Sequence, residues 1–362
     1  MKIAIDFRIF GTKYGGLGRY NHEFLRHLIK IDSQNKYILI FKEDPGLDLP
    51  KNFQVEICDC HWYSFKEQFV LPYILYKIKP DLVHFTHFNV PILYNSPYVV
   101  TIHDLIMTKF PSQRASTHSR IFFRLKYWFY QQVIRHAIFN SESIIAVSKF
   151  TAQDIIKYFE FTDVESKKIQ VIYEGVSQVE PSQKEAFNLP KNFFLYVGNA
   201  YPHKNLEFLI NAFEMFFNKH PEYHLVLAGS KDYFYKRLES ETKCPNIIFT
   251  GHITDDVLAS YYKNARAYVF PSKYEGFGLP PLEAMAHSLP VLSSQASCLP
   301  EILGHSALYF DPDDQNDLFQ KMEEIVANNL LRAELIKAGL KQIQKYSWSD
   351  MTKKILEVYK NY

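Results

Sequence analysis

Short apolar runs alternate with longer amphipathic stretches along the whole chain, and this alternation limits the fold more than any other feature of the sequence. The runs are rich in Val and Ile, and the stretch after the first run spaces Leu17, Phe24 and Leu28 as the buried face of a helix does. Strands and helices that alternate in this way predict parallel, doubly wound sheets and therefore the α/β class. In the first half the candidate strands are 2–7, 37–41, 81–86, 98–103, 143–147 and 169–173.

The alternation is interrupted once, which predicts two domains. The segment 175–190 (GVSQVEPSQKEAFNLP) is rich in polar and turn-forming residues, and 362 residues exceed what one hydrophobic core usually supports. We expect a first domain at 1–174, a linker at 175–190, a second domain at 191–346, and a final helix at 347–362 that packs back on the first domain. The candidate strands of the second domain are 193–197, 224–228, 246–250, 267–270, 291–293 and 307–310, with helices near 204–218, 254–264 and 279–287.

Composition and charge indicate the cellular compartment and the kinds of partner that we expect for this protein. The four cysteines do not form the pattern of a disulfide framework, the first residues contain no signal-peptide region, and no run of about 18 apolar residues is present to span a membrane. These features predict a cytoplasmic protein. Basic residues exceed acidic ones in the first half, which favours an anionic lipid surface or a phosphorylated acceptor as partner. Because no nucleic-acid-binding motif accompanies this excess, we expect no nucleic-acid partner.

Open parallel sheets bind ligands beyond the carboxyl ends of their strands, so two such domains predict a site in the cleft between them. The most informative loop is 270–286 (FPSKYEGFGLPPLEAMA), in which a candidate strand ends, glycines leave backbone amides open, and Pro281 suits the first position of a helix. Such a loop and helix N-terminus can hold a diphosphate. Glu275 and Glu283 can both accept hydrogen bonds from a polyol; the alternative is that both are solvated surface acids.

This segment resembles the motif of two glutamates separated by seven residues in glycosyltransferase family 4. Members of that family have the GT-B fold, in which two Rossmann-like domains face a cleft, and they transfer sugars with retention of anomeric configuration. The resemblance implies that Glu275 and the residues after it hold the donor sugar, whereas Glu283 holds the ribose. The implied donor-binding residues that follow Glu275 are Gly276, Phe277, Gly278 and Leu279.

A second segment, 193–212 (FFLYVGNAYPHKNLEFLINA), resembles the strand, loop and helix whose lysine binds the donor phosphates in that family. The resemblance gives this role to Lys204, at the opening of a predicted helix; simple solvation is the alternative. Many relatives have an arginine where this chain has His203, and a neutral imidazole supplies less positive charge than a guanidinium. Either His203 is protonated beside the phosphates, or Lys204 and the helix dipoles suffice.

The first domain adds a glycine-rich loop and a histidine. The loop 11–18 (GTKYGGLG) lacks the complete fingerprint of a dinucleotide-binding fold, because Asn21 stands at the position of the third glycine. By resemblance, Gly15, Gly16 and Gly18 lie beside the donor, although a structural turn is an equal alternative. The resemblance also places His103 near the donor sugar, against the alternative of a structural histidine. The predicted catalytic residues are His103, Lys204 and Glu275.

Several other polar residues do not indicate a metal site. His84 and His87 lack a cysteine or carboxylate partner in a metal-binding pattern, so we interpret them as polar residues at a strand end. The acidic segment 311–314 is typical of a turn before a helix, and Ser148 is typical of a helix cap. By resemblance, basic residues and helix dipoles replace a divalent ion. We therefore expect no metal and no cofactor.

No acidic residue occurs between Asp104 and Glu142, whereas basic and aromatic residues are interleaved through 114–136. This composition suits an interfacial membrane helix or a lipid-linked acceptor. Peripheral association with the inner face of the plasma membrane is therefore one prediction. The equal alternative is an amphipathic helix that buries its aromatic side chains in the first domain.

The segments GLGRY, HKNLE and YEGFGLPPLEAMA are most similar to bacterial mannosyltransferases of polysaccharide assembly. The resemblance implies GDP-mannose as donor and a glycan or polyprenyl-diphosphate-linked glycan as acceptor, in lipopolysaccharide or O-antigen biosynthesis. Alternatives within the fold are a retaining transferase that uses a UDP-sugar (GlcNAc or glucose), a nucleotide-sugar 2-epimerase and a glycogen-type synthase. The alternative of another class is a non-catalytic protein that binds nucleotide-sugars or glycans.

Overall fold

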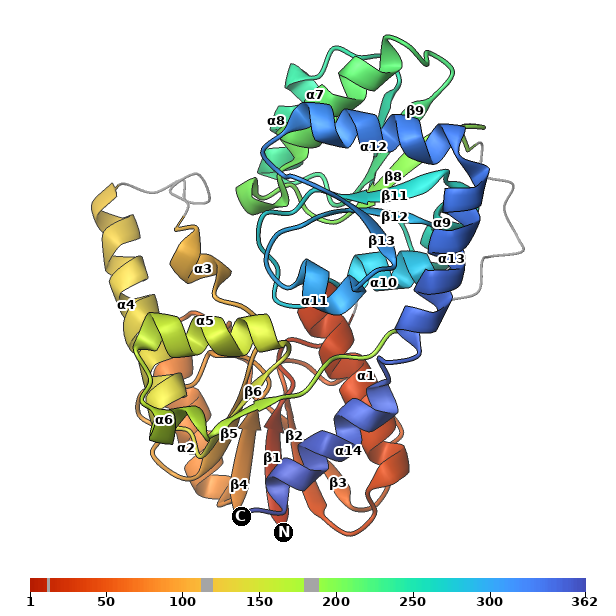
Figure 1. Ribbon diagram of the computed structural model, residues 1–362. Helices are drawn as coiled ribbons and strands as arrows, with labels where there is room; N and C mark the ends of the chain where they lie inside the picture. Colours follow the sequence, from red (N-terminus) through yellow and green to blue (C-terminus); the bar gives the residue numbers. More distant parts are fainter. Residues whose placement is uncertain (12–13, 112–119, 179–188) are drawn as a thin grey trace. The chain divides into compact units, whose positions relative to one another are not determined.

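The computed structural model describes residues 1–11, 14–111, 120–178 and 189–362, without the side chains of 120–122, and it divides into two compact units (Figure 1). The first unit comprises Met1–Gly175 and Ser347–Tyr362, and the second comprises Val176–Tyr346. Each unit contains one parallel sheet with helices on its faces. The predicted class of two doubly wound α/β domains is confirmed, whereas the cleft between them stays a prediction.

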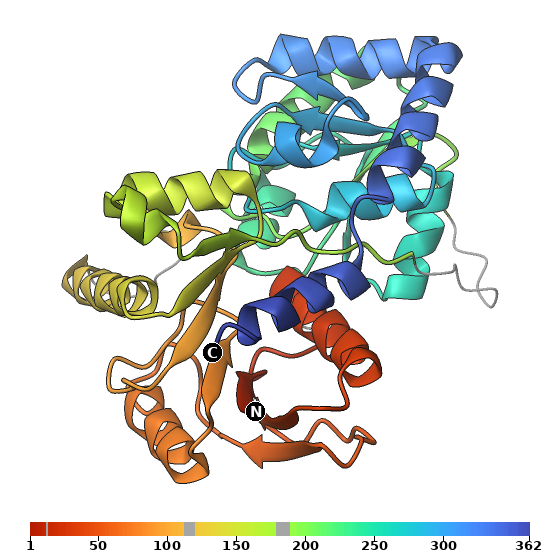
Figure 2. The same ribbon diagram turned by 60° about the horizontal axis from the view of Figure 1, so that its bottom comes forward.

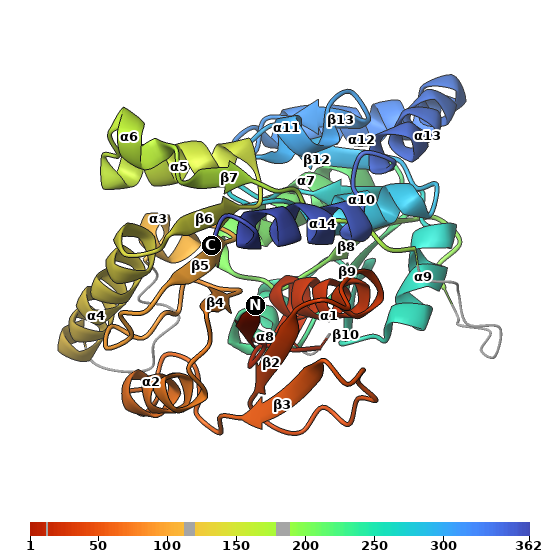
Figure 3. The same cartoon turned by 90° about the horizontal axis from the view of Figure 1, so that it is seen from below.

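The first unit has a 7-stranded sheet in the order β3-β2-β1-β4-β5-β6-β7. Its strands are β1 (Lys2–Asp6), β2 (Lys36–Phe41), β3 (Phe53–Ile57), β4 (Leu82–Phe85), β5 (Tyr98–Ile102), β6 (Ser143–Ala146) and β7 (Ile169–Val171). Its helices are α1 (Gly15–Ile31), α2 (Glu67–Ile78), α3 (Ile106–Lys109), α4 (Arg120–Phe139), α5 (Lys149–Phe159), α6 (Asp163–Ser166) and α14 (Trp348–Tyr359). One core cluster joins α2, α4 and α5 to the sheet, and α14 packs against α1 (Figures 2 and 3).

The second unit has a 6-stranded sheet in the order β10-β9-β8-β11-β12-β13. Its strands are β8 (Phe193–Val197), β9 (His224–Ala228), β10 (Ile247–Gly251), β11 (Ala267–Phe270), β12 (Val291–Ser294) and β13 (Ala307–Phe310). Its helices are α7 (Leu206–Phe217), α8 (Tyr233–Glu241), α9 (Asp255–Asn264), α10 (Leu279–Ala286), α11 (Leu299–Leu303), α12 (Gln315–Ala327) and α13 (Asn329–Ile343). Both sheets reverse their strand order once, between β1 and β4 in the first unit and between β8 and β11 in the second.

The structure adds elements that the pattern did not predict. Strand β3 lies at the edge of its sheet and exposes Gln54, so its sequence lacks the apolar run of the inner strands.

Helix α12 begins after Asp314, whose side chain accepts hydrogen bonds from the amides of Asn316 and Asp317. The acidic turn before a helix is therefore confirmed. The Ser148 cap is also confirmed, because its side chain accepts a hydrogen bond from the Thr151 amide.

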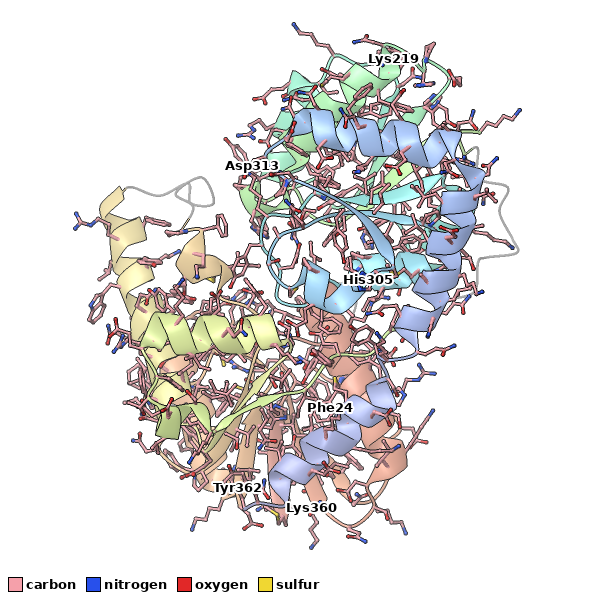
Figure 4. The ribbon with its side chains drawn as sticks, viewed as in Figure 1. Phe24, Lys219, His305, Asp313, Lys360 and Tyr362 are labelled. Atoms are coloured by element: carbon pink, nitrogen blue, oxygen red, sulfur yellow. The ribbon has the colours of Figure 1, made fainter. Side chains whose placement is uncertain are left out.

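The C-terminal segment, helix α14 and the residues after it, is joined to the first sheet through polar contacts. The His84 ring bonds through Nδ1 with the Tyr359 hydroxyl at 2.5 Å and through Nε2 with the Thr101 hydroxyl at 2.8 Å. Tyr362, labelled in Figure 4, bonds with the Ser143 hydroxyl at 2.7 Å. The prediction that His84 is a strand-end residue is wrong, because its side chain lies within β4 and links that strand to α14.

Burial of His84 and His87 makes the stability of the first unit depend on pH. Burial lowers the pKa of each imidazole to about 3, with a smaller contribution from the nearby His103. Both rings are therefore neutral in the folded protein near pH 5, whereas an unfolded histidine takes up a proton near pH 6.5. Their contribution to stability is complete above about pH 6.5 and is lost as the pH falls toward 3. We expect the free energy of unfolding to fall by about 1.4 kcal/mol per pH unit for each histidine between pH 6 and 4.

Tryptophan fluorescence in urea tests this expectation, because Trp62, Trp128 and Trp348 all lie in the first unit and account for all 3 tryptophans of the chain. The matched variant is His84→Gln, which keeps hydrogen-bonding groups and removes one titrating ring. The free energy of unfolding of this variant should change less steeply with pH, by about 1.4 kcal/mol per pH unit between pH 6 and 4. An unchanged pH slope in this variant contradicts the expectation.

Candidate functional site

The loops that follow β8 and β11 flank the point where the second sheet reverses its strand order. The loop after β8 carries His203 and Lys204, and the loop after β11 carries Glu275. The two loops are joined by a backbone hydrogen bond of 2.8 Å, in which the Lys273 amide donates to the His203 carbonyl. In open parallel sheets, the carboxyl edge at such a reversal is where ligands bind. The strand order therefore makes this edge the candidate site of the second unit.

Lys204 and Glu275 form an ion pair at this edge. The Nζ–Oε1 distance is 2.6 Å, and the two side chains are only 15% and 10% exposed. The ammonium also lies 5.7 Å from the centre of the Phe270 ring. An anionic ligand at this position can share the ammonium with Glu275, while the carboxylate accepts hydrogen bonds from hydroxyl groups.

The position of Lys204 differs from the prediction in one respect. It belongs to a short 3₁₀ turn, Pro202–Lys204, rather than to the opening of an α-helix. Asn205 follows in a left-handed conformation with φ of 62°, and only then does α7 begin. The Asn205 side chain donates to the Pro312 carbonyl at 2.8 Å. This turn directs the lysine toward the loop that carries Glu275.

His203 is buried beside this pair. Its pKa is lowered to about 4, mainly by burial and also by the positive charge of Lys204, while Glu275 acts in the opposite direction. The imidazole is therefore neutral at pH 7 in this structure. A donor diphosphate would raise this pKa as Glu275 does, so both alternatives for His203 in the donor complex stay predictions.

The start of α10 provides backbone amides next to Glu275. The helix begins at Leu279, as the predicted bounds 279–287 have it, and prolines occupy its first turn, although Pro281 is the third helical residue rather than the first. Gly278, the preceding residue, has a φ of +93°, and a Cβ there would lie 3.0 Å from the Leu299 side chain, so glycine is required. Within the described residues, no side chain caps this helix. The amide of Leu279, the first residue of the helix, can therefore face an anion.

Two other predicted residues of this segment, Phe277 and Glu283, have buried side chains that contact different neighbours. Phe277 is buried with its ring edge against Tyr346 at 5.5 Å, so only its backbone can contact a ligand. Glu283 is buried and accepts a hydrogen bond from the Tyr262 hydroxyl at 3.4 Å. Sequence reasoning missed Ser297 in the loop after β12, whose hydroxyl accepts a hydrogen bond of 3.0 Å from the Glu275 amide. No motif marks this serine, and only the packing of three neighbouring loops brings it to the site.

The glycine-rich loop of the first unit leads into α1, which begins at Gly15. Gly15 and Gly16 are exposed at the start of this helix. Gly18 is buried, and a Cβ there would lie 2.0 Å from the Gly11 carbonyl oxygen. Gly18 is therefore required by close packing of the helix on its own entry loop, which supports the structural alternative for this residue.

A buried polar cluster that the sequence did not predict lies where the first sheet reverses its strand order. Arg8, just after β1, contacts Asp6 and Glu67 with Nη2–O distances of 2.6 Å to each carboxylate. Asn89, after β4, also donates to Glu67. Burial raises the pKa of the Glu67 carboxyl, although Arg8 opposes this shift. Glu67 and Asn89 are far from Asp6 and Arg8 in the sequence and belong to no motif, so only the folding of the sheet and its helices brings them together.

His103, just after β5, has both ring nitrogens engaged within the first unit. Nε2 donates to the Thr86 carbonyl at 3.0 Å, and Nδ1 lies 3.1 Å from a Glu174 carboxylate oxygen. The Thr86 carbonyl and the Glu174 carboxylate therefore fix the orientation of the ring within the first unit. The predicted hydrogen bond from His103 to a donor hydroxyl requires one of these contacts to open.

Glu174 was also missed by sequence reasoning. It lies 3.1 Å from Nδ1 of His103, although the two residues are 71 positions apart and no motif joins them.

The structure thus divides the predicted site residues between the two units. It brings Lys204 and Glu275 into contact, with His203 and the start of α10 beside them. His103 and the glycine-rich loop belong to the first unit. Within the described parts of the chain, no three His, Cys, Asp or Glu side chains gather as metal ligands do. No described helix is both long and apolar enough to cross a bilayer.

Comparisons with known proteins match both halves of the chain. The model of Glycosyltransferase Family 4 matches residues 14–178, and that of Glycosyl transferases group 1 matches residues 178–342. The chain is 32% identical over 235 residues to the serotype-specific mannosyltransferase WbdA of Escherichia coli; the match covers 58% of this chain and 28% of WbdA. It is 30% identical over 259 residues to the O-antigen chain mannosyltransferase RfbU of Salmonella typhimurium, covering 70% and 67% of the two chains.

The fold has close counterparts among solved structures. The structure of Alr3699/HepE from Anabaena, in complex with UDP and glucose, matches with a TM-score of 0.74 at 16% sequence identity and covers 100% of each chain. At this identity the likeness establishes the arrangement of elements. The match to WbdA spans little more than a quarter of that protein's length, so WbdA has further parts without a counterpart in this match.

Proposed function

The chain belongs to glycosyltransferase family 4 and, on that premise, we propose that it is a retaining hexosyltransferase that transfers mannose from GDP-mannose to a glycan or lipid-linked glycan. The single observation that carries the proposal is the Lys204–Glu275 pair at the strand-order reversal, next to the uncapped start of α10. Support for mannose comes from WbdA and RfbU, both named as mannosyltransferases. The reaction belongs to cell-surface polysaccharide assembly.

In this proposal the residues of the second unit bind and activate the donor. Lys204 and the amides at the start of α10 stabilise the negative charge that grows on the departing diphosphate. Glu275 orients the sugar by accepting hydrogen bonds from its hydroxyls. The leaving phosphate accepts the proton of the acceptor hydroxyl on the same face of the sugar, so the carboxylate does not act as a covalent nucleophile. No metal ion or cofactor takes part.

For the lipid-linked acceptor of this proposal, the carrier is a polyprenyl diphosphate. Its lipid anchor places the acceptor at a membrane surface, and the enzyme therefore works as a peripheral protein at the cytoplasmic face. The basic excess of the first half is consistent with both the diphosphate and an anionic bilayer. Residues 114–119 of the basic and aromatic segment 114–136 lie outside the described parts of the chain.

Calorimetry with a panel of nucleotide-sugars tests the donor. We expect GDP-mannose to bind more tightly than UDP-GlcNAc or UDP-glucose, and NMR of the product to show the anomeric configuration of the donor. Tighter binding of a UDP-sugar establishes the alternative donor class, which the UDP complex of a protein with the same fold suggests. Binding without transfer or hydrolysis establishes the non-catalytic alternative.

A further inference from the structure

Ser297 has a backbone conformation that serine rarely adopts. It lies in the loop after β12, and its φ of 55° falls in the left-handed region, where a Cβ is disfavoured and glycine is the usual residue. Glycine would therefore fit this position with less strain than serine does. Because strained residues gather at functional sites, this position calls for an account of what the side chain contributes.

The Ser297 hydroxyl contacts the loop that carries Glu275. Its oxygen accepts a hydrogen bond of 3.0 Å from the Glu275 amide, across 22 positions of sequence. The hydroxyl also makes a hydrogen bond with the thiol of the neighbouring Cys298, which is fully buried. The side chain of Ser297 therefore has two possible roles, which are to hold the backbone of Glu275 or to hold Cys298.

Two further hydrogen bonds hold the same stretch of the β11 loop. The Ser294 hydroxyl, at the end of β12, donates to the Ser272 carbonyl. The Lys273 amide donates at 2.8 Å to a carbonyl of the loop after β8. The β11 loop is thus held from both sides, and the contact from Ser297 is the one made to Glu275 itself.

We propose that Ser297 is a positioning residue for Glu275, which it holds in place when a nucleotide-sugar takes over the ammonium of Lys204. Without a ligand, Lys204 orients the Glu275 carboxylate at 2.6 Å. A donor diphosphate competes for this ammonium, so the carboxylate needs a second anchor if it is to accept hydrogen bonds from the sugar. The bond from the Glu275 amide to Ser297 is such an anchor, because it acts on the backbone and leaves the carboxylate available. This inference rests on the proposed role of Glu275 in orienting the donor sugar.

The variant Ser297→Gly separates positioning from stability. It loses the hydroxyl but relieves the left-handed strain, so its melting temperature should stay within about 4 °C of that of the unaltered protein. In calorimetry its affinity for GDP should change by less than about twofold, because the diphosphate keeps Lys204. Its preference for GDP-mannose over GDP should fall about fivefold, because the sugar loses an oriented acceptor. In transfer assays kcat should fall by about 10–100-fold.

Two further variants are matched to this one. Ser297→Ala also lacks the hydroxyl but keeps the strain, so it should show the same fall in preference with a melting temperature below that of Ser297→Gly. Ser288, before β12, is exposed and is also left-handed, with a φ of 60°. Ser288→Gly therefore makes the same backbone change at the other end of the strand, and it should leave both the preference and kcat unchanged.

The preference for GDP-mannose over GDP is the decisive measurement, because a merely structural defect lowers the active fraction without changing this ratio. An unchanged ratio and an unchanged kcat in Ser297→Gly overturn the proposal. A lower melting temperature with an unchanged ratio also overturns it and assigns the hydroxyl to Cys298. Equal losses of affinity for GDP and GDP-mannose show that the hydroxyl acts on the nucleotide, and they contradict the positioning of Glu275.

A failure of the proposed function appears in the unaltered protein and is therefore distinct from these outcomes. If that protein binds a UDP-sugar more tightly than GDP-mannose, the same ratio is measured with UDP and that UDP-sugar. If it binds a nucleotide-sugar without transferring the sugar, the ratio still decides whether Ser297 positions Glu275.

Discussion

Replacement of Lys204 by alanine is expected to lower kcat/KM for sugar transfer by about 10²–10³-fold while donor binding weakens less. The ammonium is 15% exposed and is held by Glu275 at 2.6 Å, so its charge acts in a site with little water around it. A group in that position stabilises the diphosphate more as the bond to the sugar breaks and negative charge accumulates. Its removal should therefore affect the chemical step more than the ground state.

The effect should be specific to this lysine. Lys231→Ala is the matched control, because Lys231 also forms an ion pair, with Glu239 at 2.7 Å, but is 43% exposed. It should leave kcat/KM within about twofold, since exposed pairs contribute little. Lys204→Arg keeps the charge and should retain part of the activity. Near-normal sugar transfer by Lys204→Ala, with an unchanged circular dichroism spectrum, would show that the Lys204–Glu275 pair is not part of the catalytic site.

Replacement of Glu275 by alanine is expected to abolish sugar transfer. Loss of this carboxylate removes both the partner of Lys204 and the acceptor for sugar hydroxyls. Glu275→Gln keeps the shape and accepts hydrogen bonds but loses the charge, so it should weaken orientation of the sugar less than alanine does. Steady-state kinetics of the two variants separates the orienting role from the electrostatic one.

The α/β alternation was predictable because inner strands are buried on both faces and are therefore continuously apolar. Val99 and Val100 in β5, or Leu225 and Val226 in β9, illustrate this pattern. Strand β3 has polar residues, such as Gln54, because it lies at an edge and faces water. Its residues alternate between apolar and polar (FQVEI), so the strand has a period of two but lacks the continuous apolar run that marks the inner strands.

The polar clusters of the two units differed in how well the sequence revealed them. Glu275 and Lys204 belong to motifs, and the structure brings them into contact across 71 residues of sequence. Arg8 and Glu67 belong to no motif and meet because β1 and β4 are neighbours in the sheet. The neutrality of His203 was also beyond sequence reasoning, because it results from burial, which depends on how loops pack.

Replacement of Arg8 by methionine is expected to lower the free energy of unfolding of the first unit by about 3–5 kcal/mol. Arg8 and Glu67 have side chains that are 2% and 0% exposed, so the variant leaves a buried carboxylate without its cation. Burial already raises the pKa of Glu67 while Arg8 opposes it, so loss of Arg8 should raise that pKa further. The folded state then binds a proton more readily than the unfolded state, and the destabilisation should increase as the pH rises from 5 to 8.

The double variant Arg8→Met/Glu67→Leu tests whether the unpaired charge of Glu67 causes the loss of stability. With both charges replaced by apolar side chains of similar size, the desolvation cost of Glu67 disappears, so most of the lost stability should return. Asp6 remains, but its side chain is 11% exposed and reaches water more easily than Glu67 does. Tryptophan fluorescence in urea follows all three proteins, because every tryptophan lies in this unit. If the double variant is as unstable as Arg8→Met, the cluster contributes through its shape and hydrogen bonds, and the unpaired charge is not the cause of the loss.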